Sequence, residues 1–227
     1  MLRRDVLYES KREGHAKSFN CLCVSTSQLY VGLGNGQIIS IDKKSGRVVR
    51  RFFGHSAFVS SVLILPKQRR LMSSSYDGTI RAYSLNTTAV VMTDKSHKDA
   101  VNTMVFSNGN QVLYSSSFDG TVRSMKLGCT SEKVCEFDCG VFALTVIDLP
   151  FYDQLEEETK DPTIMAGLTS GSIEIIIKSS PRFRLTGHNE MVTCLKTIKG
   201  EDHRFGLISA SRDGTARLWS VDIDSET

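Results

Sequence analysis

Histidine and aspartate recur along this 227-residue chain at a spacing that could serve acid–base chemistry. A histidine near a carboxylate is a common general base. Four of the five histidines precede an Asp-Gly or Asn-Gly dipeptide by 20 to 25 residues, and they are His15, His55, His97 and His188. An active site needs one such constellation, whereas this pairing returns in several copies along the chain. The repetition indicates a structural role, so we predict no catalytic residue and no enzymatic activity.

Metal and nucleotide chemistry are also disfavoured. The six cysteines contain no C-x-x-C pair, and cysteine and histidine do not show the spacing of zinc ligands. The segment 32–36, Gly-Leu-Gly-Asn-Gly, superficially resembles a phosphate-binding loop, but that motif must be followed by a helix, and strand-like Gln37-Ile38-Ile39-Ser40 follows instead. We therefore expect free thiols, no metal, no cofactor and no small-molecule substrate.

The elements that position the histidines and aspartates form an internal repeat. Five similar segments end in the turn dipeptides Asn35-Gly36, Asp77-Gly78, Asp119-Gly120, Ser170-Gly171 and Asp213-Gly214. Successive dipeptides are 42, 42, 51 and 43 residues apart. An apolar residue marks the start of each segment, at Phe19, Val59, Val101, Val141 and Val192. Short runs rich in β-branched and aromatic residues, interrupted by Asp-Gly, indicate strands joined by tight hairpins. Four such strands in about forty residues are typical of one β-propeller blade.

On these residues the chain resembles the WD-repeat (β-transducin-like) family, without a subfamily being identified. The fifth unit carries the fullest set of the family's residues, which are Gly187-His188, Ser209, Ser211, Asp213-Gly214 and Trp219. In that family a His, a Ser or Thr, an Asp and a Trp form one hydrogen-bonded set in each blade. The resemblance therefore implies such a set in the fifth unit.

The other units match this pattern less completely. The resemblance implies that His55 pairs with Asp77 and that His97 pairs with Asp119, while Tyr83 and Met125 occupy the Trp position there. The fourth unit carries Phe137, Ser170 and Ile176 at the His, Asp and Trp positions. We expect that unit to lack the polar set and to be held by apolar packing alone.

We predict an all-β fold, a single WD-repeat propeller domain over residues 1–227 with five recognisable four-stranded blades. The repeats are expected at about 14–53, 54–95, 96–136, 137–186 and 187–221. The fifth repeat stops after its third strand, and residues 5–10 could supply the missing fourth strand. A closed five-bladed ring and part of a larger propeller both agree with the sequence.

Composition sets limits on function. The net charge is +3, with 40% hydrophobic and 23% charged residues, which is ordinary for a globular protein. No apolar run is long enough to span a membrane and no secretory signal is present, so we expect a cytoplasmic or nuclear protein without membrane insertion. The resemblance implies a non-enzymatic scaffold that assembles a multiprotein complex through its propeller faces. The alternative is an RNA-binding or ribonucleoprotein-associated propeller that uses the basic clusters 47–51, 67–70 and 182–184.

Partner proteins are expected to dock on the face that carries the turn dipeptides, where loops from every blade converge. Two positions of each repeat reach this rim, one just before the turn Asp or its substitute and one just before the apolar mark. The large side chains at these positions, named the rim residues here, are Phe58, Tyr76, Phe118, Met191 and Arg212. Aromatic residues, Met and Arg are enriched at binding hot spots. For Phe58 and Phe118 the alternative is packing between neighbouring blades.

Overall fold

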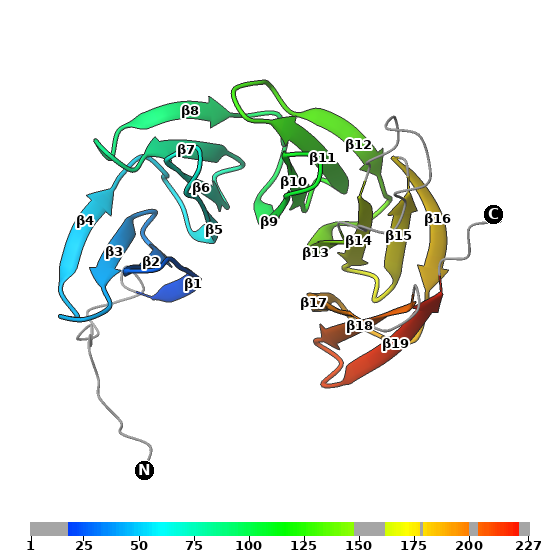
Figure 1. Ribbon diagram of the computed structural model, residues 1–227. Coiled ribbons are helices and arrows are strands. Elements are labelled where there is room, and N and C mark those ends of the chain that lie inside the picture. Colours follow the sequence, from blue (N-terminus) through cyan, green and yellow to red (C-terminus); the bar gives the residue numbers. More distant parts are fainter. Residues whose placement is uncertain (1–17, 148–161, 178, 200–203, 223–227) are drawn as a thin grey trace, which may run out of the picture. The chain divides into compact units, whose positions relative to one another are not determined.

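The computed structural model describes residues 18–147, 162–177, 179–199 and 204–222, and every regular element among them is a β-strand (Figure 1). The strands form five antiparallel sheets in which chain neighbours pair. The prediction of an all-β fold with five repeated sheets is confirmed. The chain divides into two compact units, residues 1–101 and 102–227, which are described separately. A single domain over the whole chain stays a prediction.

The first unit contains two four-stranded sheets. The first sheet consists of β1 (Phe19–Val24), β2 (Gln28–Leu33), β3 (Ile38–Asp42) and β4 (Val48–Phe52). The second sheet consists of β5 (Val59–Leu65), β6 (Arg70–Ser75), β7 (Ile80–Ser84) and β8 (Val90–Asp94). The order of strands across each sheet is the order in the chain, because short turns join antiparallel neighbours.

The second unit contains the other three sheets. The third sheet consists of β9 (Val101–Ser107), which starts at the unit boundary, β10 (Val112–Ser117), β11 (Thr121–Lys126) and β12 (Glu132–Glu136). The fourth sheet consists of β13 (Val141–Ile147), β14 (Thr163–Leu168), β15 (Ile173–Ile177) and β16 (Ser180–Leu185). The fifth sheet consists of β17 (Val192–Lys199), β18 (Arg204–Ser211) and β19 (Ala216–Asp222).

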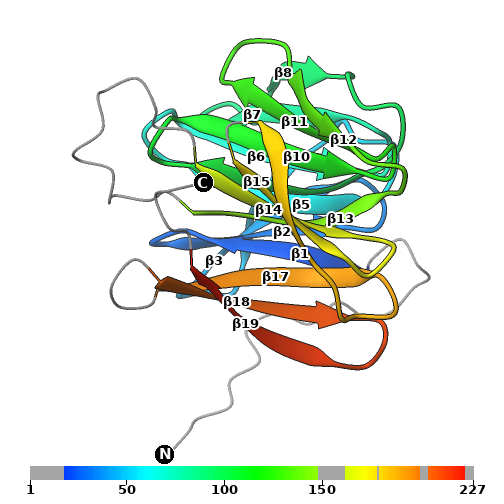
Figure 2. The same cartoon turned by 90° about the vertical axis from the view of Figure 1, so that its right-hand side faces the viewer.

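The fifth sheet has three strands in the described part of the chain (Figure 2). This is the place where the sequence predicts a missing fourth strand. The segment 5–10, predicted to supply it, lies outside the described residues. A closed five-bladed ring and part of a larger propeller therefore both stay predictions.

Each first strand starts at a residue that the sequence marks as apolar. In the second unit, β13 starts at Val141 and β17 at Val192, and both side chains are fully buried. The register shifts directly after each of these residues, as between Val192 and Cys194. Such a bulge leaves one residue unpaired and bends the strand. The apolar mark therefore anchors the first strand while the bulge turns the rest of it.

Within each unit, the hydrophobic core lies between successive sheets. In the first unit one cluster joins the first and second sheets, and its buried members are Tyr30, Ile38, Phe52, Val59, Val62, Leu71 and Tyr83. In the second unit one cluster joins the third and fourth sheets, and another joins the fourth and fifth. Burial of these faces, at roughly 25 cal/mol per Å² of apolar surface, fixes the turns at the ends of the strands.

Candidate functional site

The fifth sheet builds a continuous hydrogen-bonded set. His188 Nδ1 lies 2.9 Å from Asp213 Oδ2, and His188 Nε2 lies 2.7 Å from Ser209 Oγ. Trp219 Nε1 donates to the same Ser209 oxygen at 2.8 Å. An ionised carboxylate only accepts, so the proton of the neutral imidazole sits on Nδ1 and Nε2 accepts from Ser209. The donors thus run in one direction, from Trp219 through Ser209 and His188 to Asp213.

Ser211 has a different role from Ser209. Its hydroxyl donates to Glu190 O at 2.8 Å and accepts from Asp213 N at 3.1 Å, so it caps the turn. Thr215 is a further member that the sequence did not single out: its hydroxyl donates to Asp213 Oδ1 at 2.7 Å and lies 3.1 Å from His188 Nδ1. The Asp-Gly-Thr string, present in three of the units, is the signal that could have identified it.

The second sheet repeats this arrangement. His55 Nδ1 lies 2.8 Å from Asp77 Oδ2, and His55 Nε2 lies 2.7 Å from Ser73 Oγ. Thr79 donates its hydroxyl to Asp77 Oδ1 at 2.6 Å. Tyr83, at the Trp position, is fully buried in the core cluster between the first and second sheets. The structure therefore joins His55 to Asp77, and adds Ser73 and Thr79, which the sequence analysis did not name.

Asp119 holds the turn of the third sheet in the same way. Its amide donates to Ser117 Oγ at 3.0 Å, and its carboxylate accepts from Thr121 N at 2.9 Å. His97 is buried in the first unit, whereas Asp119 belongs to the second. Their predicted pairing stays a prediction. His15, the corresponding residue of the first repeat, lies outside the described residues.

The fourth sheet differs from its neighbours. Ser170 Oγ lies 3.0 Å from Ser172 Oγ in an exposed turn, and Ile176 is fully buried. Apolar packing is not the whole account, because Arg184 Nε donates to the buried carboxylate of Glu174. The expectation that this sheet is held by apolar packing alone is therefore wrong. A lone Glu in the run Ile-Glu-Ile-Ile-Ile was the available signal, since a charge in a strand buried on both faces needs a partner.

The carboxylates of the His–Asp pairs in the second and fifth sheets are held ionised. Burial acts to raise the pKa of Asp77, but hydrogen bonds from His55 and Thr79 outweigh it and hold this pKa well below its usual range. The hydroxyl and amide of Thr215, with His188, lower the pKa of Asp213 in the same way against desolvation. Each carboxylate is saturated with donors, and both ring nitrogens of each histidine are bonded. The geometry is that of a structural clamp between a turn and the start of its sheet.

The cysteines and the other groups that could bind a metal show no sign of a reactive site in the described residues. All six cysteines are free thiols, and burial raises the pKa of Cys21 and of Cys135 to about 12, which keeps these thiols protonated. In the part of the chain that the structure describes, no three His, Cys, Asp or Glu side chains gather as metal ligands would. Within the same residues, no helix is long and apolar enough to cross a membrane.

The two rim positions of a repeat lie side by side at the turn end of the second and fifth sheets. Tyr76 N donates to Phe58 O at 2.9 Å, and Arg212 N donates to Met191 O at 3.0 Å. In the first unit the rings of Phe58 and Tyr76 are stacked at 5.7 Å, and these side chains are 39% and 43% exposed. This pair forms an aromatic platform open to solvent.

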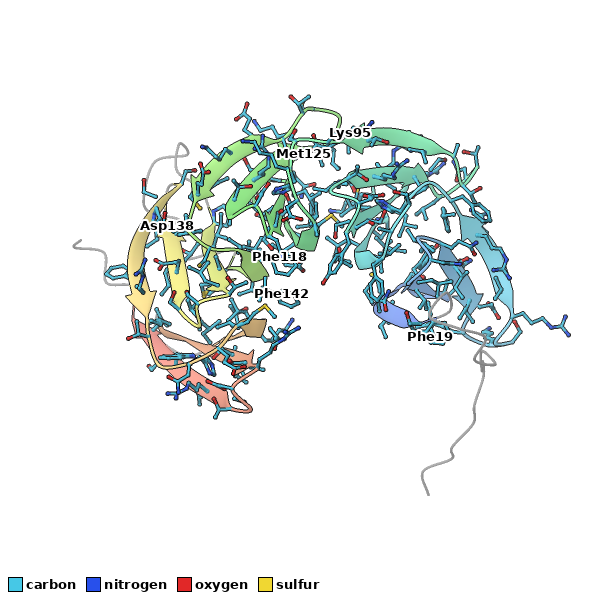
Figure 3. All side chains as sticks on the ribbon, turned by 180° about the vertical axis from the view of Figure 1, so that it is seen from behind. Phe19, Lys95, Phe118, Met125, Asp138 and Phe142 are labelled. Carbon is cyan, nitrogen blue, oxygen red and sulfur yellow. The ribbon has the colours of Figure 1, made fainter. Side chains whose placement is uncertain are left out.

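In the second unit the centroid of the Phe118 ring lies 5.8 Å from that of Phe142. Both residues are labelled in Figure 3. Phe118 is half-buried and packs against Gly140, where a Cβ atom would lie 2.9 Å from its ring. This contact joins the third and fourth sheets, as the packing alternative for Phe118 expects. Met191 is half-buried and Arg212 is exposed. Phe142, the residue after an apolar mark, was not identified from the sequence.

Turn glycines hold this end of the sheets against the next sheet. Gly171 has a φ of +93°, and a Cβ placed on it would collide with the backbone oxygen of His188. Gly120, with a φ of +81°, meets the backbone oxygen of Phe137 in the same way. Only glycine combines the left-handed backbone with this close approach. The turn glycines thus fix the turns that carry both the polar sets and the rim residues.

Comparisons with known proteins agree with this geometry. The family model "WD domain, G-beta repeat" matches residues 46–84, 89–124 and 179–220, more than half of the chain. Pre-mRNA-processing factor 19 of Mus musculus, of Rattus norvegicus and of Bos taurus is 32% identical to the chain over 81 residues. That stretch is 35% of this chain and 16% of each relative, so the chain spans a small part of the relatives' length. Blades with Asp-Gly turns and these matches lead to one conclusion: the chain belongs to the WD40 family of WD-domain, G-beta-repeat proteins.

Proposed function

We propose that the chain is a non-enzymatic protein-interaction scaffold that assembles a multiprotein complex, with partners docking on the rim residues. The observation that carries this proposal is the stacked Phe58–Tyr76 pair, which is exposed yet held by a backbone hydrogen bond of 2.9 Å. Aromatic side chains already fixed in place lose little conformational entropy on binding. They are also the residue type that dominates binding hot spots.

The polar sets support a scaffold rather than a catalyst. Each His–Asp pair has its ring nitrogens and carboxylate oxygens bonded within its own sheet, and the arrangement is present in both the second and the fifth sheets. A general base must instead face a substrate proton. In this proposal the clamps keep the turns rigid, so that the rim residues of each sheet are held in place.

The comparisons suggest a compartment for this scaffold. The relatives' name assigns them to pre-mRNA processing, and we propose that the present chain likewise works in the nucleus, as part of a multiprotein assembly. Localisation of the tagged full-length gene product by microscopy tests this, and an exclusively cytoplasmic signal would contradict it.

An RNA-associated function is the second candidate. The turns of the first unit opposite the Asp-Gly turns expose Lys43, Lys44, Lys67 and Arg69. Clustered cations bind phosphates by counterion release, so such binding weakens steeply as salt increases. A salt titration of RNA binding separates the candidates, because a protein scaffold retains RNA only weakly and loses it at physiological salt.

The decisive experiment compares variants at the two ends of the strands. Tyr76→Ala combined with Arg212→Glu removes the aromatic platform and reverses the exposed rim charge, while Lys67→Glu changes the turn at the other end of β6. Partners are recovered by affinity purification and mass spectrometry from cells that express each full chain. We expect the rim variant to lose partners and the Lys67 variant to keep them. The reverse result, with normal folding of both, would place docking at the opposite end.

A further inference from the structure

Strand β4 exposes an alternating row of cationic and apolar side chains. Within its sheet β4 pairs with β3 alone, so its other edge is free in the described residues. The exposed residues on and beside this strand, named the β4 track here, are Arg47, Val49, Arg51 and Phe53. Val49 is 49% exposed and Phe53 is 57% exposed. The residues between them, Val48, Arg50 and Phe52, are half-buried or buried. The track is therefore open, and its two chemistries alternate.

The fourth strands of the third and fourth sheets do not share this character. In β12, Lys133 pairs with Glu136 at 2.6 Å, so charges of both signs neutralise each other. In β16, Arg184 pairs with Glu174, and Pro181 lacks a backbone donor. Edge strands of this kind resist pairing with other chains. In β4, by contrast, no carboxylate of the described residues pairs with the arginines.

The Phe53 end of the track adjoins the second sheet of the same unit. A Cβ atom at Gly54 would lie 3.3 Å from Val90 Cγ2 and 2.9 Å from a terminal nitrogen of Arg81. Val90 is 39% exposed and Val91 is 47% exposed, so apolar surface continues beyond Phe53.

Arg81 adds a cation at this end that is short of partners. In the third sheet the corresponding Arg123 donates to the hydroxyl and the carbonyl of Ser131, both at 2.9 Å. The second sheet has Ala89 where the third has Ser131, and Arg81 Nε is buried without a hydrogen-bond partner in the described residues. The track therefore ends beside an incompletely satisfied guanidinium group.

We propose that the β4 track docks an extended segment of a partner protein in which every second residue faces the track, and that these facing residues are alternately acidic and apolar. Alternate residues of a strand are about 6.6–6.8 Å apart, and an extended peptide has the same repeat. Carboxylates of such a segment pair with Arg47 and Arg51, because the guanidinium fork accommodates a carboxylate bidentately. Its apolar side chains cover Val49 and Phe53.

Side chains rather than a full backbone ladder hold this partner. The register between β3 and β4 shifts at Ser40 and Ile41, which leaves Val49 bulged. A bulge interrupts regular pairing along an edge. Nucleic acid fits the track less well, since a phosphate backbone would leave Val49 against charge, and Phe53 alone offers no row of rings for stacking bases.

The test uses the full chain and a fluorescein-labelled peptide of about twelve residues built from Glu-Ser-Val-Ser repeats, named the Glu-Val peptide here, which places alternating Glu and Val side chains on one face of an extended strand. Fluorescence anisotropy at about 0.15 M salt compares it with an all-Glu peptide and with oligouridylate of the same length. We expect the Glu-Val peptide to bind most tightly, and Arg47→Glu combined with Arg51→Glu to weaken it at least about tenfold. Phe53→Ser should weaken the Glu-Val peptide and leave the all-Glu peptide unchanged. Lys126→Glu, an exposed charge of the second unit, is the matched control and should bind as the wild type does.

Three results would overturn the proposal: undiminished Glu-Val binding by the double variant, equal binding of the all-Glu peptide, or tighter binding of oligouridylate. A second double variant, Arg47→Gln combined with Arg51→Gln, removes the charges without reversing them. Its peptide binding and its urea midpoint are both measured. Lost binding at an unchanged midpoint supports the proposal. The track shares no residue with the rim, so this proposal and the proposed function fail separately.

Discussion

The fourth and fifth sheets solve the same folding problem with different chemistry. The fourth sheet buries apolar residues on both faces, with Ile164 and Ile176 facing the third sheet and Met165 facing the fifth. The fifth sheet joins a core cluster on one face, while Ile208 and Leu218 remain 39% and 72% exposed. It is also the sheet with the complete polar set. A hydrogen-bonded clamp thus compensates where the described residues supply packing from one side only.

The largest difference in stability should appear when an apolar side chain of each of the two sheets is truncated to Ala. Met165→Ala removes a fully buried side chain and is expected to cost about 2–5 kcal/mol, because the cavity cannot be filled by its neighbours. Leu218→Ala, at 72% exposure, should change stability by no more than about 0.5 kcal/mol. Urea denaturation of both variants measures the difference. Equal losses would mean that the fifth sheet is covered on its second face as well.

A smaller effect is expected from the turns. Asp213→Ala removes the carboxylate that is bonded to the buried His188. It should lower the free energy of unfolding, measured by urea denaturation, by clearly more than the scatter of neutral surface changes, which is about 0.5 kcal/mol. Ser170→Ala, in the exposed turn of the fourth sheet, should stay within that scatter. If the two variants shifted the midpoint alike, the polar set would not be what holds the fifth sheet.

The charged pair of the fourth sheet should contribute less still. Arg184→Gln leaves the Glu174 carboxylate, which is 4% exposed, without its cation, and is expected to cost about 1 kcal/mol because Arg184 itself is 63% exposed. Lys133→Gln breaks a pair exposed on both sides and is the control, with an effect of at most about 0.5 kcal/mol. If Lys133→Gln lost as much stability as Arg184→Gln, burial of the Glu174 carboxylate would not be what makes its ion pair matter.

The last prediction concerns how the stability of the second sheet depends on pH. Since the folded-state pKa of Asp77 is below its usual value of 3.8, ionisation of this group stabilises the fold fully above that value. The contribution is lost as the pH falls below about 4 towards the folded-state pKa. Asp77→Asn should therefore lose stability less steeply between about pH 5 and pH 2 than the wild type, as measured by urea midpoints. Parallel slopes for the variant and the wild type would show that the pKa of Asp77 is not lowered in the folded state.

The same comparison shows why some residues were beyond sequence reasoning. Ser209 and Ser211 lie two apart on β18 and share a face, so alternation alone cannot tell which one bonds to His188. The register decides, because it brings the indole of Trp219 to Ser209 and leaves Ser211 at the turn. The burial of Glu174 has the same origin, since the fourth sheet is enclosed by sheets on both sides.

What the sequence determined by itself is local. Asp-Gly and Asn-Gly dipeptides and the alternation of apolar residues set the strands, the turns and the repeat, because hairpin geometry and side-chain period depend on near neighbours. Only the tertiary structure decided which face of each strand is covered. It left Val49 and Phe53 in solvent, stacked Phe58 on Tyr76 and placed Phe118 against Phe142. These outcomes depend on contacts between residues that are well separated in the chain, within a sheet for Phe58 and Tyr76 and between sheets for Phe118 and Phe142, and no short pattern encodes them.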